Sequence, residues 1–212
     1  MNIDLLNRFF DLNDEQRAQF ELFSDIFLEK NAQVNLVSRK DSENLIERHF
    51  LHSITVGKFY NLAGARVLDV GTGGGFPGLP LAILFPTAQF HLVDARAKKI
   101  AAVNDFASHM GLKNVVASHV RIEEFHEKFQ FVVSRAVTGL ERFTNWVEKN
   151  VERGAHLGQH QGIIYLRGLD FDFNTINDEI NQSFDCNRII HLEEHFDLDF
   201  FSSKKVIFLQ RL

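Results

Sequence analysis

Apolar positions near the start of the chain recur with the period of a helix. Phe20, Phe23 and Phe27 are separated by three and four residues and so mark one helical face. Residues 13–16, which begin with Asn and end with Gln, have the form of a capping box at the start of this helix. After a polar break, a second helix is predicted over 41–60. The beginning of the chain is therefore expected to be helical.

From residue 66 onward, short β-rich runs alternate with helical stretches. Five runs have the composition of strands, namely 66–70, 89–93, 114–117, 129–134 and 162–166. The segments between them predict helices over 79–85, 96–110 and 140–151 and a short turn at 121–125. This alternation with short links predicts a parallel sheet that is covered by helices on both faces.

Two last β-rich runs, 188–192 and 204–209, have only a short non-helical link between them, so they are predicted to pair antiparallel at one edge of the sheet. Seven strands with an antiparallel end are the outline of an α/β, Rossmann-like class I methyltransferase, although the alternation alone also fits other doubly wound sheets. We expect an N-terminal helical region at 1–62 and the Rossmann-like domain at 63–212.

Composition narrows the class of protein. The chain has 212 residues, of which 45% are hydrophobic and 24% charged, as in a soluble globular protein with one core. No apolar run approaches the ~18 residues of a membrane span, and the N-terminus lacks the features of a signal peptide. The single cysteine, Cys186, excludes an internal disulfide and fits a cytoplasmic protein.

Charge is distributed unevenly along the chain. The net charge is −5, but residues 170–200 contain nine acids and one base and so carry −8. The rest of the chain therefore carries +3. A polyanion such as RNA is compatible with this distribution if the basic part of the molecule faces it.

A glycine-rich loop follows the first predicted strand of the sheet. Residues 67–78 read Val-Leu-Asp-Val-Gly-Thr-Gly-Gly-Gly-Phe-Pro-Gly. Glycine lets a ligand lie against bare backbone, and open α/β sheets bind ligands at the carboxyl ends of their strands. Residues 73–78 also satisfy G-x-G-x-x-G, which by itself is weak evidence for a dinucleotide.

Two carboxylates refine the choice of ligand. Asp94 ends the next strand, where a carboxylate can accept hydrogen bonds from both hydroxyls of a ribose, in NAD or in S-adenosylmethionine. Asp69 stands at the start of the loop, where it repels a pyrophosphate but suits a sulfonium and an amino group. The residues favour S-adenosylmethionine, with an NAD-dependent oxidoreductase as an alternative.

Residues 69–78 resemble the first motif of the RsmG family (GidB, glucose-inhibited division protein B), the 16S rRNA guanine-N7 methyltransferases. Other blocks agree with that family in order and spacing, namely Asn35-Leu36-Val37-Ser38, Arg48-His49 with Ser53, Ser134-Arg135-Ala136, and Leu166-Arg167-Gly168. The resemblance extends from about residue 20 to the C-terminus. It implies a cytoplasmic enzyme that transfers a methyl group from S-adenosylmethionine to N7 of guanine 527 of 16S rRNA in the small ribosomal subunit.

The resemblance also implies roles for individual residues. The cofactor-binding residues would be Gly71, Gly73, Phe76, Asp94, Ile122, Glu123 and Arg135. The substrate-binding residues would be Arg39, Arg48, His49 and Arg167. The sequence departs from the family at four motif positions, where the usual residues are Pro, Leu, Asp and Lys and this chain has Gly74, Phe76, His52 and Arg167.

Arg135 is the candidate catalytic residue, although a surface ion pair is the ordinary fate of an arginine. Guanine N7 carries a lone pair and no proton, so its methylation needs accurate placement rather than a general base. Residues 134–136 lack the Pro-Pro-Tyr element of many adenine-N6 enzymes, and Cys186 in the acidic segment disfavours the thiol chemistry of cytosine C5.

A set of basic residues forms the candidate RNA face, namely Arg39, Lys40, Arg48, His49, Lys58, Arg96, Lys98 and Lys99. No metal site is expected, because the H-x-x-E-H sequence at 191–195 follows a predicted strand and His156 and His160 flank Gly158 in a predicted loop. A small-molecule methyltransferase and a non-catalytic RNA-binding module remain alternatives. We expect a monomer that does not bind a membrane.

Overall fold

A seven-stranded mixed sheet forms the centre of the molecule in a computed structural model, which describes residues 3–135, 137–168 and 173–212. Its strands are β1 (Arg66–Val70), β2 (Gln89–Asp94), β3 (Val115–His119), β4 (Phe131–Arg135), β7 (Gly162–Gly168), β8 (Phe184–His191) and β9 (Lys204–Arg211). They lie in the order β3-β2-β1-β4-β7-β9-β8, and β9 runs in the opposite direction to the other six strands. The predicted parallel sheet with an antiparallel edge hairpin is confirmed.

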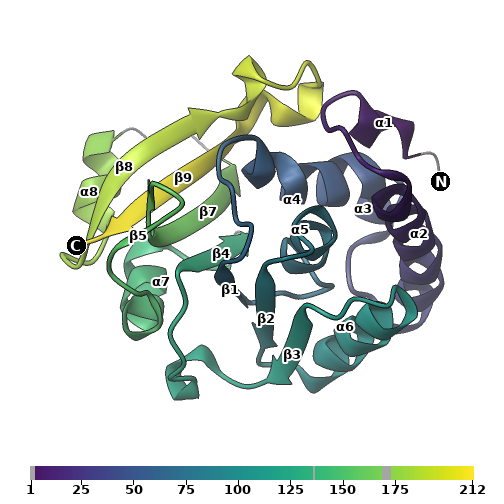
Figure 1. The fold of residues 1–212 in the computed structure, drawn as a ribbon, viewed down its shortest axis with the longest axis horizontal. Coiled ribbons are helices and arrows are strands. Elements are labelled where there is room, and N and C mark those ends of the chain that lie inside the picture. Colours follow the sequence, from purple (N-terminus) through teal and green to yellow (C-terminus); the bar gives the residue numbers. More distant parts are fainter. Residues whose placement is uncertain (1–2, 136, 169–172) are drawn as a thin grey trace.

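Helices cover both faces of this sheet. The helices α2 (Asp14–Val34), α5 (Gly78–Leu84) and α6 (Ala97–His109) lie to the right of the sheet in Figure 1, and α7 (Leu140–Val147) and α8 (Phe173–Glu179) lie to the left. Successive residues of β1 pack on opposite faces of the sheet. Val67 belongs to the hydrophobic cluster that contains residues of α2, α5 and α6, and Leu68 belongs to the cluster that contains residues of α7 and α8. Period-2 alternation of apolar side chains on both faces is what a doubly covered strand requires.

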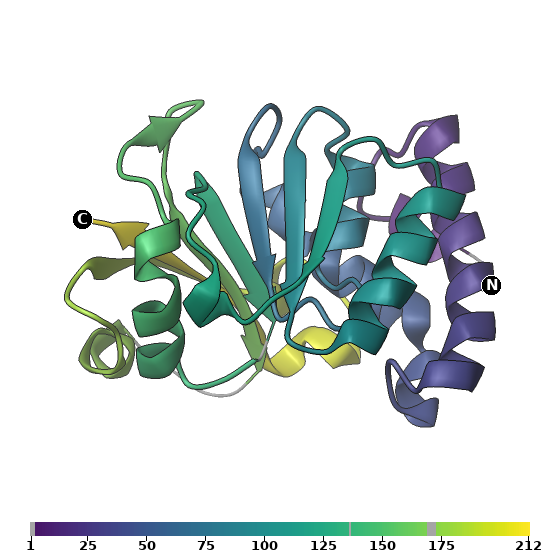
Figure 2. The ribbon, with the colours of Figure 1, turned by 90° about the horizontal axis from the view of Figure 1, so that it is seen from below.

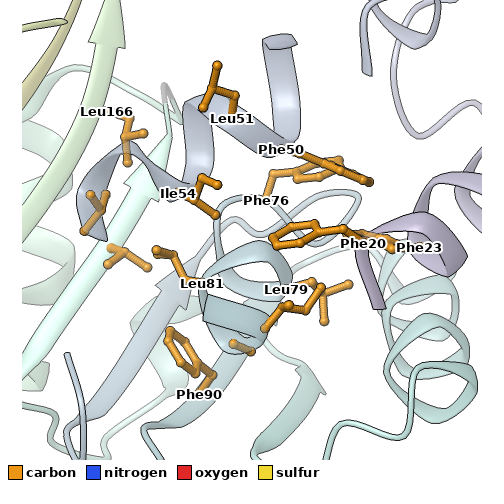
Figure 3. Close-up of a cluster of buried hydrophobic side chains, with 14 of the residues drawn as sticks. Phe20, Phe23, Phe50, Leu51, Ile54, Phe76, Leu79, Leu81, Phe90 and Leu166 are labelled. Atoms are coloured by element: carbon orange, nitrogen blue, oxygen red, sulfur yellow. The ribbon is translucent and has the colours of Figure 1, made fainter. Parts of the chain in front are cut away.

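Helix α2 begins at the predicted capping box. The backbone N–H of Gln16 donates to Asn13 Oδ1 at 2.9 Å, and that of Asn13 donates to Gln16 Oε1 at 3.1 Å. Further along the helix, Phe23 and Phe27 are fully buried and contact Phe76 of the glycine loop. Figure 3 shows this aromatic cluster between the N-terminal helices, the loop and the sheet.

One hydrophobic cluster runs from the N-terminal helices into the sheet, so the division at residue 62 remains a prediction. Viewed from below in Figure 2, α2 stands beside α6 at the edge of the molecule next to β3. The two helices are also linked by an ion pair, in which Lys30 Nζ lies 2.7 Å from Asp105 Oδ2. The N-terminal helices therefore complete the layer that covers this face.

The second helix predicted over 41–60 is present as a helical segment, although it is not one regular helix. The chain forms four short elements instead, namely α3 (Arg39–Ser42), a π-helical segment η1 (Ile46–Leu51), α4 (His52–Ile54) and a 3-10 turn η2 (Thr55–Lys58). The hydroxyl of Ser53 donates to the His49 carbonyl at 2.6 Å, and that of Thr55 to the His52 carbonyl at 2.7 Å. Such bonds compete with the regular helix ladder and disturb it.

Several short elements were not predicted from the sequence. They are α1 (Asp4–Asn7), α8, the hairpin of β5 (Ala155–His156) and β6 (Gln159–His160), the turns η4 (Glu148–Asn150) and η5 (Leu192–Glu194), and η6 (Asp199–Ser203). The predicted turn near 121–125 is present as η3 (Ile122–Glu124). The interpretation of His156 and His160 as loop residues is therefore wrong, and the link between β8 and β9 contains two 3-10 turns.

Within the described ranges, no helix has the length and apolar character that crossing a bilayer requires. The same residues contain no group of three or more His, Cys, Asp or Glu side chains that could hold a metal ion. In the H-x-x-E-H sequence, His191 ends β8 and His195 follows η5, so the two histidines do not share a helix.

Candidate active site

The glycine loop connects β1 to α5 at the point where the order of the strands reverses, between β1 and β4. Its backbone is tied to β2, because the N–H groups of Gly71 and Thr72 both donate to the Val93 carbonyl, at 2.9 and 3.1 Å. Gly71 has a φ of +71°, and a Cβ there would lie 2.6 Å from Val137 Cγ2. Glycine is therefore required at this position by both backbone conformation and space.

Asp69 lies beneath the loop rather than beside a ligand. Its side chain is fully buried, and Oδ2 accepts a hydrogen bond from the Gly78 N–H at 2.9 Å. Burial raises the pKa of Asp69 to about 7, against the opposing effect of the charge on Arg135. The interpretation of Asp69 as a direct partner of the ligand is therefore not supported by its position, since it joins the two ends of the loop.

Asp94 holds the same loop from the end of β2. Its Oδ2 accepts from the Gly73 N–H at 3.0 Å, and its Oδ1 accepts from the Arg96 N–H at 2.9 Å. A carboxylate has about four lone-pair sites, so each oxygen retains the capacity to accept from a ligand hydroxyl. Its backbone bonds thus orient the carboxylate and leave it able to bind a ribose.

A cavity of about 460 Å³ opens beside Asp94. Five of the predicted cofactor-binding residues line it, namely Gly71, Asp94, Ile122, Glu123 and Arg135. The wall also contains residues that the sequence analysis did not single out, among them Val137, Arg142 and Trp146. The guanidinium of Arg142 lies over the Trp146 ring, 4.7 Å from the centre of the ring. These three residues follow β4 or lie on α7, and no motif marked them in advance.

Two predicted cofactor residues do not line this cavity. Gly73 acts through its backbone bond to Asp94. Phe76 is buried, with its ring 4.9 Å from the His49 ring and 5.2 Å from the Arg135 guanidinium. Phe76 therefore supports the side chains next to the cavity from behind.

Arg135, at the end of β4, is fixed by residues of the π-helical segment η1. Its Nη2 donates to His49 Nδ1 at 2.7 Å, and its Nη1 donates to the Arg48 carbonyl at 3.2 Å. Burial lowers the pKa of Arg135 to about 10, so it remains a cation at neutral pH. Burial and the charge of Arg135 lower the pKa of His49 to about 3, so His49 is neutral and accepts at Nδ1. These two hydrogen bonds join Arg135 to residues that stand 87 and 86 positions before it in the chain.

A second cavity, of about 270 Å³, lies on another side of Arg135. Its lining residues are Asp41, Arg48, His49, His52, Arg135, Leu166, Arg167, Gly168, Phe200 and Lys204. Three of the four predicted substrate-binding residues, Arg48, His49 and Arg167, therefore lie together. The fourth, Arg39, is the first residue of α3, and its side chain lies outside the described parts of the structure.

The other residues of the candidate RNA face are dispersed. Arg96 and Lys99 line the first cavity. Lys58 lines neither cavity, and its ammonium lies 5.2 Å from the centre of the Phe196 ring. Phe200 and Lys204, by contrast, line the second cavity although no pattern in the sequence marked them.

Solved structures share this architecture. TrmN from Thermus thermophilus matches with a TM-score of 0.56 at 15% identity, covering 76% of this chain and 48% of that one. A SAM-dependent methyltransferase from Aquifex aeolicus matches with a TM-score of 0.53 at 14% identity, covering 83% of this chain and all of that one. The strand order and these matches show the class I S-adenosylmethionine-dependent methyltransferase fold.

Sequence relatives are more specific. The chain is 43% identical to ribosomal RNA small subunit methyltransferase G of Bacteroides thetaiotaomicron over 208 residues, which are 97% of this chain and 98% of that protein. It is 39% identical to the protein of the same name from Christiangramia forsetii, over 99% of this chain and 97% of that one. Residues 16–168 match the model of the GidB family, described as rRNA small subunit methyltransferase G. The chain belongs to the GidB family.

The donors and acceptors of the first cavity fit S-adenosylmethionine. Asp94 and Glu123 would supply carboxylate acceptors for its hydroxyl and amino groups, and the bare backbone at Gly71 would allow close approach. Ile122 and Trp146 would supply the apolar surface that an adenine needs. NAD-dependent oxidation is excluded as the activity by family membership.

Replacing Asp94 should weaken cofactor binding. We expect Asp94→Ala to make the binding free energy of S-adenosylmethionine less favourable by roughly 1–3 kcal/mol, because ligand hydroxyls would lose their acceptor. The single tryptophan, Trp146, lines this cavity, so its fluorescence reports binding. Asp105→Ala removes a carboxylate from α6 outside both cavities and serves as the control. Equal affinity of wild type and Asp94→Ala would reject the role of Asp94.

Asp69 should make stability depend on pH. Because its pKa is raised to about 7 in the folded protein from 3.8, the folded state binds more protons between these values and loses stability as pH rises through them. Relative to Asp69→Asn, the wild type should lose ~1–3 kcal/mol of unfolding free energy from pH 5 to pH 8. Urea denaturation at the two pH values measures this difference.

Glu148→Gln is the matched control for that comparison. Hydrogen bonds from Ser183 and Asn181 and the charge of Arg211 lower the pKa of Glu148 below 4.5, so Glu148 is ionised at both pH values and its replacement should have the same effect at each. A stability difference between wild type and Asp69→Asn that does not change with pH would contradict the protonation of Asp69.

Proposed function

We propose that this chain transfers a methyl group from S-adenosylmethionine to N7 of guanine 527 of 16S rRNA. Its family membership already identifies it as a methyltransferase of small-subunit rRNA, and the proposal concerns the particular base and atom. The observation that carries it is the position of Arg135, which lines both the cavity with the cofactor residues and the cavity with the predicted substrate residues. A residue in that position can act on a base placed between the two.

The protonation and hydrogen bonding of the polar side chains suit a methyl acceptor that has no proton to lose. His49 is neutral, but its Nδ1 is occupied by the bond from Arg135, so it is poorly suited to act as a base. Guanine N7 needs none, since its lone pair lies in the plane of the ring and bears no hydrogen. When bound, S-adenosylmethionine supplies an activated methyl group. The chain is then required to align the base and exclude water.

Arg135 is suited to aligning guanine. A guanidinium has five N–H donors, of which the contacts with Arg48 and His49 use two. Arginine commonly recognises guanine through O6, and that bond would leave N7 available for transfer. The stacked Phe76 ring and the acceptor on His49 restrict the guanidinium to one orientation. Arg48 and Arg167 would contact the phosphates or the base from the second cavity. We propose further that the enzyme acts as a cytoplasmic monomer.

The direct test maps methylation on the rRNA. Purified small subunits from cells that lack this gene product should gain one N7-methylguanine, at position 527, when incubated with the protein and S-adenosylmethionine. Cleavage at N7-methylguanine followed by primer extension locates the modification. Methylation at another base would overturn the proposed target, and activity on free nucleosides alone would favour a small-molecule methyltransferase.

Removing the Arg135 side chain should impair transfer more than cofactor binding. We expect Arg135→Ala to slow single-turnover transfer at least about 10²-fold, because a displacement of ~1 Å at the reacting atoms can cost that much. Arg142→Ala, which removes an arginine that lines only the first cavity, is the matched control. In Asp69→Asn, which removes the ionisation of Asp69 near pH 7, the rate should show no further ionisation near pH 6.5, since the pKa of His49 is about 3. Near-normal transfer by Arg135→Ala would contradict this role.

A further inference from the structure

An aromatic ring with two cations beside it forms one wall of the second cavity. Phe200, in the 3-10 turn η6, is half-buried. The ammonium of Lys204, at the start of β9, lies 4.9 Å from the centre of this ring, and the guanidinium of Arg48, in η1, lies 5.8 Å from it. All three side chains line the cavity. The C-terminal part of the chain thus meets the N-terminal helical region at this wall.

The ring itself is held firmly. Phe201 packs against it with 5.1 Å between ring centres, and His52 meets it edge-on at 5.4 Å. Burial lowers the pKa of His52 well below its ordinary value, with Arg135 and Lys204 acting in the same direction, so His52 is neutral. Phe200 is therefore a fixed surface on which two long, flexible cationic side chains are oriented, which reduces the entropy they lose on binding a ligand.

Charge in the second cavity is strongly unbalanced. Arg48, Arg135, Arg167 and Lys204 line it, whereas Asp41 is the one carboxylate among its described lining residues. Asp41 Oδ1 lies 3.2 Å from Arg48 Nη1, and the pair is partly exposed. The excess of positive charge in a concave site attracts an anion. Cations held near an aromatic ring match the recurring phosphates of a single-stranded nucleic acid.

We propose that Lys204 and Arg48, oriented by Phe200, form a clamp that binds backbone phosphates of RNA at the second cavity. This clamp rests on the proposed function, since it assumes that the target nucleotide enters the cavity. Its contacts would position the strand without reading its sequence, as phosphate contacts generally do. Phe200 is a positioning residue, and Lys204 is a substrate-binding residue. No pattern in the sequence indicated the role of Lys204, because this lysine follows the acidic segment at 170–200.

The salt dependence of RNA binding tests the clamp. A fragment of 16S rRNA that contains the target loop is titrated with protein at several salt concentrations. Lys204→Gln should weaken binding several-fold and reduce the slope of log K against log salt by about 0.7, the change for one phosphate contact to a single strand. Lys204→Arg should restore most of both. The affinity for S-adenosylmethionine, measured by Trp146 fluorescence, should not change.

Lys128→Gln is the matched control, because it removes the same charge from an exposed lysine that precedes β4, at the opposite end of that strand from Arg135, and that lines neither cavity. It should leave affinity and slope near the wild-type values. Phe200→Leu, which keeps every charge, should weaken RNA binding while preserving most of the salt slope, and Phe200→Tyr should restore the affinity.

An unchanged affinity and slope for Lys204→Gln would overturn the clamp, as would an equal loss for Lys128→Gln or a parallel loss of cofactor binding. If Phe200→Leu fails to fold, the comparison of Lys204→Gln, Lys204→Arg and Lys128→Gln still tests the clamp. If the lysine variants behave as expected but the wild type forms no N7-methylguanine, the clamp is supported and the proposed methylation is rejected.

Discussion

The contact between Arg135 and the π-helical segment η1 is the interaction on which the site depends. A partly buried guanidinium is costly unless its N–H groups are satisfied. Here the His49 ring and the Arg48 carbonyl accept from it, and the face of Phe76 lies against it. These partners come from the N-terminal helices and the glycine loop, whereas Arg135 ends a central strand. The N-terminal helices, the glycine loop and β4 must therefore all be folded before Arg135 can line both cavities.

Aromatic packing puts them in place. Phe23 stacks on Phe50 and on Phe76, with ring centres 4.8 and 5.8 Å apart, so α2, η1 and the loop share one cluster. Because such interiors are closely packed, movement of one of these elements displaces the others. The abundance of phenylalanine in this chain thus has a structural consequence, since the rings join the helical region to the loop that holds the cofactor residues.

Charge shows a similar dependence on folding. The sequence contains an acidic stretch at 170–200, followed directly by Lys204 and Lys205. The antiparallel course of β9 brings Lys204 beside Gly168 at the end of β7, and so to the rim of the second cavity. A count of charges along the chain assigns the C-terminal segment to the acidic part of the molecule, although Lys204 belongs to a cavity whose described lining residues include four Arg or Lys side chains and one carboxylate.

The sequence by itself determined the order of strands and helices, the capping box of α2, and the glycine loop with Asp94, because these depend on local periodicity and on conformations that few residues can adopt. Its motifs also singled out Arg48, His49, Arg135 and Arg167, which the structure brings together around the second cavity, while their roles remain predictions. Only the tertiary structure decided that Asp69 lies under the loop, that Phe76 supports Arg135 from behind, and that Trp146, Phe200 and Lys204 line the cavities. Each of these depends on contacts between residues far apart in the chain, which packing and strand pairing fix and local sequence does not encode.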